Sequence, residues 1–242
     1  ARRCAVVPYL SYARKDRRTQ PRDPVNTRYV AQLLEAVGLD RLVVLDVHNS
    51  AALDNAFRVP VDHLSMAPMF AAHFAQAATD EPWAVASPDV GGIKRVQVFR
   101  AHLARRLGRE VELAFVGKQR VADRVSGDTL VGDVQGRHVI LLDDLCATGG
   151  TLERDAAAAR GAGAARVSVA VSHAPLAVGL ERLLASPAID RVIVSDSVGG
   201  ALHQCAAATA GKLTVVPSAA LLGAALARRR DGRPLTPLLE DW

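Results

Sequence analysis

The chain has 242 residues, of which 50% are apolar and 4% aromatic, and its formal net charge is +5 at pH 7. This length suits one large or two small domains, with cores built mainly of Ala, Val and Leu. The basic clusters at Arg17-Arg18 and Arg228-Arg229-Arg230 have no stacking aromatic residues between them, which argues against a nucleic-acid partner. The mild excess of positive charge suits small anionic substrates, but it also fits an arginine-rich composition without functional meaning.

Cysteine spacing and hydropathy limit the cellular compartments in which the protein can be expected. Cys4, Cys146 and Cys205 have neither the spacing of a disulfide framework nor that of a metal site, so we expect reduced thiols. The sequence shows no apolar run of membrane-spanning length and no signal peptide. It therefore predicts a cytoplasmic protein without a membrane partner. The start at Ala1, directly before a strand-like run, suggests a trimmed or partial sequence.

Apolar runs of strand length alternate with helical patterns along the chain, which predicts a mainly parallel sheet with crossover helices. Strands are expected at 4–7, 42–46, 84–87, 113–116, 138–142, 167–172, 192–195 and 213–216. Helices are expected at 25–37, 67–77, 94–107, 151–161, 179–184 and 218–229. Gly38 and Gly108 follow two of these helical runs and indicate C-terminal caps.

Two stretches show neither pattern. Residues 11–24 are charged and contain prolines, and residues 117–136 are polar and contain glycines. Loops of such length inside compact α/β folds are usually functional or disordered. We expect the second stretch to be a mobile loop that carries Lys118 and Arg120.

Residues 138–151 form the most informative stretch. An apolar run ends in Asp143 and Asp144, and a loop of Thr148, Gly149, Gly150 and Thr151 then opens an alanine-rich helix. Such a loop at a helix start presents backbone N–H groups to an anion, and the helix dipole adds to the attraction. Neighbouring carboxylates can accept hydrogen bonds from vicinal hydroxyls. Together they indicate a sugar phosphate such as ribose 5-phosphate, although plain αβ connections also use these residue types.

Polar groups follow the ends of three other expected strands. Arg14, Lys15 and Asp16 lie in a charged loop that could hold a polyphosphate, but charge alone favours a solvated run. His48 could ligate a metal or donate to a phosphate, or be satisfied by backbone. Asp89 stands where a carboxylate could hold Mg²⁺ beside substrate phosphates, although Pro-Asp and Gly-Gly also make turns.

Taken together and in order, these motifs resemble the ribose-phosphate pyrophosphokinases. The similarity runs from about Val6 to the C-terminus and rests on Pro-Tyr-x-x-Tyr-Ala-Arg-x-Asp-Arg, Asp-x-His, Val-Pro-Val-Asp-His-Leu, Ser-Pro-Asp-x-Gly-Gly, Lys-x-Arg and Asp-Asp-x-x-x-Thr-Gly-Gly-Thr. Type I phosphoribosyltransferases share the Asp-Asp loop but not the Tyr-Ala-Arg-x-Asp or Ser-Pro-Asp-x-Gly-Gly elements.

The resemblance implies an α/β fold of two tandem phosphoribosyltransferase-like units with mainly parallel sheets. The first unit would comprise residues 1–61, incomplete at its N-terminus and completed by residues 217–242. The second would comprise residues 62–216 and carry the loop that binds phosphoribosyl pyrophosphate (PRPP). The family's N-terminal half-domain, which precedes the strand at Cys4, is not part of this sequence.

The resemblance also implies a reaction for nucleotide biosynthesis: the β,γ-diphosphoryl group of ATP passes to the 1-hydroxyl of ribose 5-phosphate, giving PRPP and AMP. Mg²⁺ would be the cofactor, and the protein would be a homo-oligomer built from dimers, up to a hexamer. Two other functions stay open, a phosphoribosyltransferase that consumes PRPP with a nucleobase and a non-catalytic regulatory paralogue of the synthetase.

Carried over by residue, the resemblance assigns each motif a role. Lys118 and Arg120 would close over the reacting phosphates. The ATP contacts would be Arg14, Lys15, Asp16 and His48, and the Mg²⁺ ligands His48 and Asp89. The groups that hold ribose 5-phosphate would be the carboxylates Asp143 and Asp144 and the loop residues Thr148, Gly149, Gly150 and Thr151.

Four positions or stretches depart from the family pattern. Ala147 stands where the family usually has an acid, and Lys15 where it has Gln. Gln119 replaces a basic residue, and residues 49–54 replace a Gln-containing stretch. Loss of the acid at Ala147 should alter ribose binding without abolishing it, so we still expect an active enzyme.

Overall fold

The computed structural model describes residues 2–77, 80–88, 90–121, 124–205 and 211–240, with backbone alone at residues 90, 116–121 and 124–129. The chain divides into two compact units. Unit 1 comprises Ala1–Met66 with Ala219–Leu239, and unit 2 comprises Ala67–Ser218 with Glu240–Trp242. Both units have mainly parallel sheets with helices against them, which confirms the α/β class expected from the sequence.

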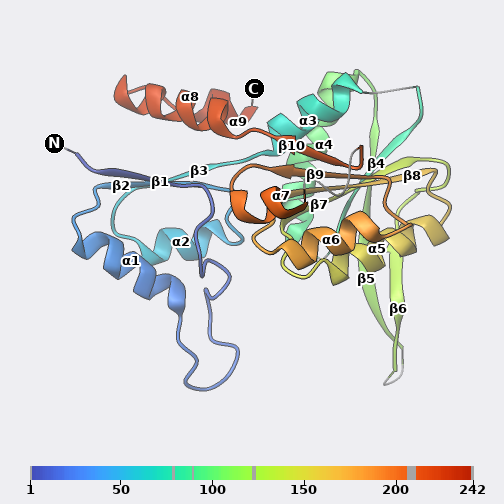
Figure 1. Cartoon of the computed structure of the whole chain (residues 1–242), viewed down its shortest axis with the longest axis horizontal. Helices are drawn as coiled ribbons and strands as arrows, with labels where there is room; N and C mark the ends of the chain where they lie inside the picture. The colour runs from blue at the N-terminus through green and yellow to red at the C-terminus, as the bar shows by residue number, and fades with distance from the viewer. Residues whose placement is uncertain (1, 78–79, 89, 122–123, 206–210, 241–242) are drawn as a thin grey trace. The chain divides into compact units, whose positions relative to one another are not determined.

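Unit 1 is built on a three-stranded parallel sheet in the order β1-β2-β3. Its strands are β1 (Cys4–Val7), β2 (Arg41–Leu45) and β3 (Val61–Leu64). Its helices are α1 (Asn26–Ala36) and α2 (Ser50–Ala56) on one face of the sheet and α8 (Ala219–Arg230) on the other (Figure 1). Leu42 and Val44 on β2 are fully buried and anchor a core that also includes Leu53 of α2.

Unit 2 contains a seven-stranded sheet in the order β10-β9-β8-β7-β4-β5-β6, in which only β5 and β6 pair antiparallel. The strands are β4 (Trp83–Ser87), β5 (Val111–Val121), β6 (Arg124–Val131), β7 (His138–Leu145), β8 (Arg166–His173), β9 (Arg191–Ser195) and β10 (Leu213–Val216). The helices are α3 (Ala67–Gln76), the 3-10 turn η1 (Val90–Gly92), α4 (Ile93–Leu107), α5 (Gly150–Gly161), α6 (Ala177–Ala185) and α7 (Gly199–Cys205).

The central strands of this sheet are apolar along their length because helices cover both of their faces. In Figure 1, α3 and α4 lie on one side of the sheet and α5 and α6 on the other. Val139, Ile140 and Leu141 on β7 are fully buried as a result. Continuous apolar runs of this kind are typical of parallel strands that are buried on both faces.

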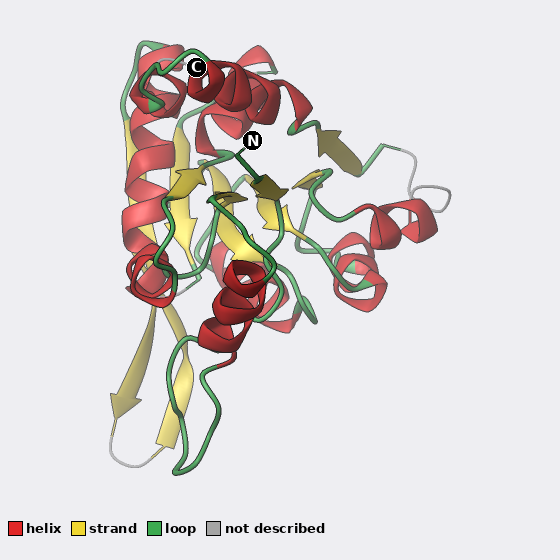
Figure 2. Cartoon of the chain, turned by 90° about the vertical axis from the view of Figure 1, so that its left-hand side faces the viewer, coloured by secondary structure: helices red, strands yellow, loops and turns green. Residues whose placement is uncertain are grey.

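Several expectations for the elements need correction. The stretch at 117–136, expected to be a mobile loop, instead carries the end of β5 and all of β6. This hairpin extends beyond the other strands of its sheet (Figure 2), so it is polar and lacks the alternation by which half-buried strands are recognised. Short elements were missed as well: α2, α7, a final helix α9 (Thr236–Glu240) and β3.

The predicted limit between residues 61 and 62 falls inside β3. This strand pairs in parallel with β2 through Leu42 and Val61, so the ladder keeps it in unit 1, which continues to Met66. At the other end, unit 2 continues to Ser218, two residues past the predicted limit.

Two glycine caps agree with the sequence. Gly108 ends α4 in the left-handed conformation with φ of +65°, and Gly38 after α1 has φ of +85°. In the described part of the chain, none of the helices combines the length and the apolar character needed to cross a bilayer.

Candidate functional site

The candidate site lies at the carboxyl end of β7, where the strand order of the unit 2 sheet reverses. After β4 the chain first adds β5 and β6 on one side and then returns to place β7 on the other. Ligands of open α/β sheets bind outside the carboxyl ends of the strands at such a reversal. Asp143 and Asp144 occupy this end of β7, and α5 begins six residues later at Gly150.

Arg95 of α4 pairs with both acids. Its Nη1 lies 3.0 Å from Asp144 Oδ1 and 3.4 Å from Asp143 Oδ1. The Asp144 backbone N–H also donates to Asp143 Oδ1 at 2.8 Å. The side chain of Asp144 is 6% exposed and that of Asp143 is 27% exposed, so the pair is buried yet open to a ligand at Asp143.

Burial and mutual repulsion shift the titration of this pair. Burial, followed by the charge of Asp144, raises the pKa of Asp143 to about 7, although the guanidinium of Arg95 opposes both effects. Near neutral pH the two carboxyls therefore share less than two full negative charges. Such a pair suits neutral hydroxyl groups that can both donate and accept hydrogen bonds.

The loop between β7 and α5 has its shape fixed by contacts between backbones. Gly149 has φ of +73°, and a Cβ added to it would lie 2.6 Å from the carbonyl oxygen of Gly179 on α6. A Cβ on Gly179 would lie 2.4 Å from the carbonyl oxygen of Ala147. Only glycine fits at these two positions, so the loop is seated before any ligand arrives.

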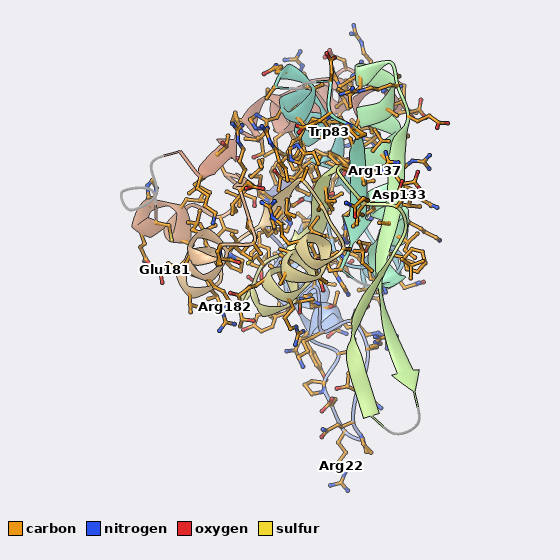
Figure 3. All side chains as sticks on the ribbon, turned by 90° about the vertical axis from the view of Figure 1, so that its right-hand side faces the viewer. Arg22, Trp83, Asp133, Arg137, Glu181 and Arg182 are labelled. Carbon is orange, nitrogen blue, oxygen red and sulfur yellow. The ribbon has the colours of Figure 1, made fainter. Side chains whose placement is uncertain are left out.

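The start of α5 offers an environment for an anion. Its first backbone N–H groups lack intrahelical partners, and the helix dipole favours negative charge there. Arg182 of α6, labelled in Figure 3, donates from Nη1 to the carbonyl oxygen of Thr148 at 3.4 Å. Its Nε lies 3.5 Å from the carboxylate of Glu153, the acid of this first turn. The negative charge of Glu153 is therefore offset by a cation.

Cys146 at the start of the loop serves packing. Its side chain is buried, and its backbone N–H donates to the carbonyl oxygen of His173 at 2.8 Å. Burial, with a smaller contribution from the charge of Asp143, raises the pKa of its thiol to about 12. The thiol therefore stays protonated and is not a nucleophile at neutral pH.

Lys118 and Arg120 lie on β5 beyond Phe115, the last residue of this strand that pairs with β4. Lys118 pairs with Asp128 of β6 and Arg120 pairs with Val125, and the register shifts between the two positions. The mobile loop expected here is thus a strand with an irregular ladder. Bulges of this kind often lie near functional sites because they redirect side chains.

The four residues expected to contact ATP belong to unit 1. Arg14 and Lys15 are exposed in the loop after β1, and His48 is exposed in the segment after β2. Asp16 accepts a hydrogen bond of 2.7 Å from Nδ2 of Asn49, which joins these two segments at the carboxyl ends of adjacent parallel strands. Asp16 thereby positions the residue next to His48.

Thr27 stabilises the loop after β1, because its hydroxyl donates to the carbonyl oxygens of Tyr12 at 3.0 Å and Lys15 at 3.2 Å. Asp89, expected to be a metal ligand, lies outside the described residues. The structure thus gathers Asp143, Asp144 and the loop in unit 2, and Asp16 with the His48 segment in unit 1.

Comparison with known proteins gives a consistent result for the whole chain. Residues 66–183 match the phosphoribosyl transferase domain, and residues 1–38 match the N-terminal domain of ribose phosphate pyrophosphokinase. The ribose-phosphate pyrophosphokinase of Granulibacter bethesdensis is 36% identical over 98% of this chain and 73% of its own length. That of Hyphomonas neptunium is 34% identical over the same shares. This chain belongs to the ribose-phosphate pyrophosphokinase family.

A solved structure of the family agrees with this assignment. The phosphoribosylpyrophosphate synthetase of Mycobacterium smegmatis superposes with a TM-score of 0.79 and is 28% identical over 96% of this chain and 72% of its own. The ribose-phosphate pyrophosphokinase resemblance drawn from the motifs is therefore confirmed, as is the phosphoribosyltransferase type of the fold.

One residue of the site escaped the sequence analysis. Arg95 touches both acids of the pair although 48 residues separate it from Asp143. A signal was present, because Lys94 and Arg95 are cations in the first turn of a helix, where the dipole disfavours positive charge. Cations at such a position indicate a nearby negative group that stabilises them.

The raised pKa of Asp143 predicts how the Asp143→Asn variant changes stability with pH. Asp143 binds a proton more tightly in the fold than in the unfolded chain, so its stabilising contribution is lost as pH rises through about 7. The introduced asparagine cannot ionise, so the stability of the variant relative to the wild type should increase from pH 5 to pH 8. We expect a relative gain on the order of 1 kcal/mol, or about 2–4 °C in melting temperature.

Asp133→Asn is the matched control for this measurement. The hydrogen bond from Arg137 holds the pKa of Asp133 below its usual range. The stability of Asp133→Asn relative to the wild type should therefore not increase as the pH rises. Thermal melts of the three proteins at pH 5, 6, 7 and 8 measure the trend. A difference in melting temperature between Asp143→Asn and wild type that stays constant with pH would contradict the raised pKa of Asp143.

Proposed function

We propose that the chain transfers the diphosphoryl group of ATP to the 1-hydroxyl of ribose 5-phosphate and releases PRPP and AMP. The observation that carries this proposal is the Asp143–Asp144 pair beside the preformed loop at the start of α5, at the strand reversal of a family fold. The geometry offers acceptors for a diol and amide donors for a phosphate within one short segment.

In this proposal the ribose hydroxyls bind the acid pair and the 5-phosphate binds the loop. Asp143 is the more exposed acid and accepts a hydrogen bond from a ribose hydroxyl, while Arg95 orients Asp144. The backbone groups of Thr148, Gly149, Gly150 and Thr151 surround the phosphate. Ala147 removes the acid usual at its position, so the sugar contacts two carboxylates here.

ATP is proposed to bind the unit 1 residues Arg14, Lys15, Asp16 and His48, with Lys118 and Arg120 against the reacting phosphates. Phosphoryl transfer depends mainly on positioning and on neutralising charge at the phosphate oxygens. Two cations on a projecting hairpin can supply that charge and exclude water when substrates are bound.

Mg²⁺ fits this site as an ion shared with substrate. Among the described residues no three His, Cys, Asp or Glu side chains gather into a metal cage. Mg²⁺ needs no such cage, because it is usually held by one or two carboxylates together with substrate phosphates and water. His48 and Asp89 are the proposed protein ligands, and the bound ion would neutralise charge on the ATP phosphates.

One assay tests the function. The full-length protein is incubated with ATP, Mg²⁺ and ribose 5-phosphate, and AMP and PRPP are measured. We expect equal amounts of both products. Release of pyrophosphate from PRPP in the presence of a nucleobase, without use of ATP, would identify a phosphoribosyltransferase instead. Binding of Mg²⁺-ATP without AMP formation would identify a regulatory subunit.

The proposal includes a homo-oligomer in the cytoplasm. Tyr29 and Leu33 of α1 and its C-cap residue Val37 recur every four residues and are 57%, 69% and 71% exposed. An apolar stripe of this kind suits contact with a second copy of the chain. The three cysteines are free thiols, as a reducing compartment requires.

The Leu33→Glu variant should therefore form smaller assemblies, because it places a charge within the apolar stripe of α1. Light scattering coupled to size exclusion measures the mass. Gln32→Glu adds the same charge at the neighbouring exposed position and should leave the mass unchanged. Equal masses for Leu33→Glu and wild type would exclude this stripe as the interface.

A further inference from the structure

A pocket lies at the opposite end of the unit 2 strands, where four of them begin. Four adjacent parallel strands, β4, β7, β8 and β9, begin with Trp83, His138, Arg166 and Arg191. The pairing register places Trp83 beside His138 and His138 beside Arg166. These residues, together with His73 of α3, line a pocket of about 280 Å³.

This pocket is separate from the proposed substrate site. His138 begins β7 and Asp143 lies five residues further along it, which at about 3.3 Å per residue is a distance of roughly 17 Å. Figure 3 shows Trp83 toward the end of unit 2 that is opposite the tip of the β5–β6 hairpin. A ligand in the pocket would therefore not touch the Asp143–Asp144 loop.

The floor of the pocket is rigid and aromatic. The rings of Trp83 and His138 stack with centroids 4.3 Å apart, and Phe74 meets both edge-on. His138 Nδ1 lies 3.2 Å from Glu81 Oε1 and Nε2 lies 2.8 Å from Ser168 Oγ. Since a carboxylate only accepts, Nδ1 carries the proton and the neutral ring accepts at Nε2 from the Ser168 hydroxyl.

The rim of the pocket is cationic. Arg191 is exposed and has no acidic partner among the described residues, and Arg166 lies 3.6 Å from Glu81 with 53% of its side chain exposed. Asp190, the acid of the lining, already accepts from Arg160 and from the backbone N–H of Val167. Its charge is thus offset, and positive charge remains at the rim.

The size and chemistry together limit the ligand. A volume of about 280 Å³ lies just below the range of about 300–1,000 Å³ usual for drug-sized ligands. Trp83 is 2% exposed and His138 is 6% exposed, so the floor offers little aromatic surface on which a base or a sugar could stack. Arginine side chains with free N–H donors match oxyanions, which they bind by charge-assisted hydrogen bonds.

We propose that this pocket binds a small oxyanion of the phosphate class, held by Arg191, Arg166 and His73 above the Trp83–His138 floor. The proposal does not depend on the reaction at the Asp143–Asp144 loop. It identifies a second anion site in the same unit, at the amino-terminal ends of the strands.

Trp83 provides the readout, because the only other tryptophan of the sequence is Trp242. The full chain with Trp242→Phe is titrated with inorganic phosphate at constant ionic strength set by chloride. We expect a saturable change of Trp83 emission with phosphate and with sulfate. Arg191→Gln in this background should raise the half-saturating phosphate concentration at least about tenfold.

Two control variants separate this pocket from other anion contacts. Arg137→Gln removes the same charge one residue before His138, where Arg137 pairs with Asp133 outside the pocket (Figure 3), and should leave the titration unchanged. Thr151→Val removes a hydroxyl from the loop proposed to bind the substrate phosphate, and it should also leave the Trp83 titration unchanged. An unsaturable signal, an equal curve for Arg191→Gln, or loss of the signal in Thr151→Val would overturn the proposal.

Discussion

The Lys118→Ala variant should lose about 10²- to 10³-fold in kcat while its affinity for ribose 5-phosphate changes by less than about threefold. Removal of one group that stabilises transition-state charge typically has an effect of this size. Lys118 lies on the hairpin, whereas the acid pair and the loop that are proposed to hold the sugar lie at the β7–α5 connection. Steady-state kinetics separate the two effects, since a group acting only in the transition state lowers kcat and kcat/KM equally.

Gln119→Ala is the matched control for Lys118→Ala. It truncates the neighbouring side chain of the same strand without removing a charge, and we expect turnover near that of wild type. The two variants share any effect on the hairpin backbone, so only loss of the cation distinguishes them. Equal kcat values for Lys118→Ala and wild type would remove Lys118 from the mechanism.

Gly149→Ala should reduce kcat/KM for ribose 5-phosphate by about 100-fold or more. Its φ of +73° costs a non-glycine residue about 1–2 kcal/mol, and the added Cβ would lie 2.6 Å from the Gly179 carbonyl oxygen. Backbone cannot yield as a flexible side chain does, so the loop must shift. A misplacement of about 1 Å in a substrate-positioning group can cost about 10²-fold in rate.

Gly108→Ala separates loop displacement from backbone strain. Gly108 has a similar φ of +65° at the end of α4, but an added Cβ would meet nothing within 4 Å. Both variants should therefore lose stability from the strained backbone in thermal melts, and Gly149→Ala should lose more because of the added contact, while only Gly149→Ala should lose activity. Comparable kcat/KM values for the two variants would show that the contact with Gly179 does not fix the loop.

The fold and the β7–α5 loop could be predicted because their signals are local. Continuous apolar runs mark strands buried on both faces, and Asp143, Asp144 and Gly149 lie within seven consecutive residues. The hairpin was missed for the opposite reason. Its ladder is stabilised by pairing of β5 with β6 outside the covered sheet, which leaves no periodic burial in the sequence.

Features that depend on strand order could not be read from the sequence. Arg95 reaches Asp144 only because β4, which precedes α4, lies next to β7 in the sheet. Trp83, His138 and Arg191 each begin a different strand and look unrelated along the chain. Their shared pocket follows from the parallel register, which sequence patterns do not specify.

The projecting hairpin should separate locally more often than the rest of the sheet. Beyond the sheet, β5 and β6 are joined to each other by a single ladder with a register shift at Lys118 and Arg120. A ladder of two strands with no third strand beside it separates at a much smaller free-energy cost than the core strands of a sheet. Amide protons of β5 beyond Phe115, the last residue paired with β4, should therefore exchange with solvent far sooner than those of β7, and bound nucleotide should slow that exchange.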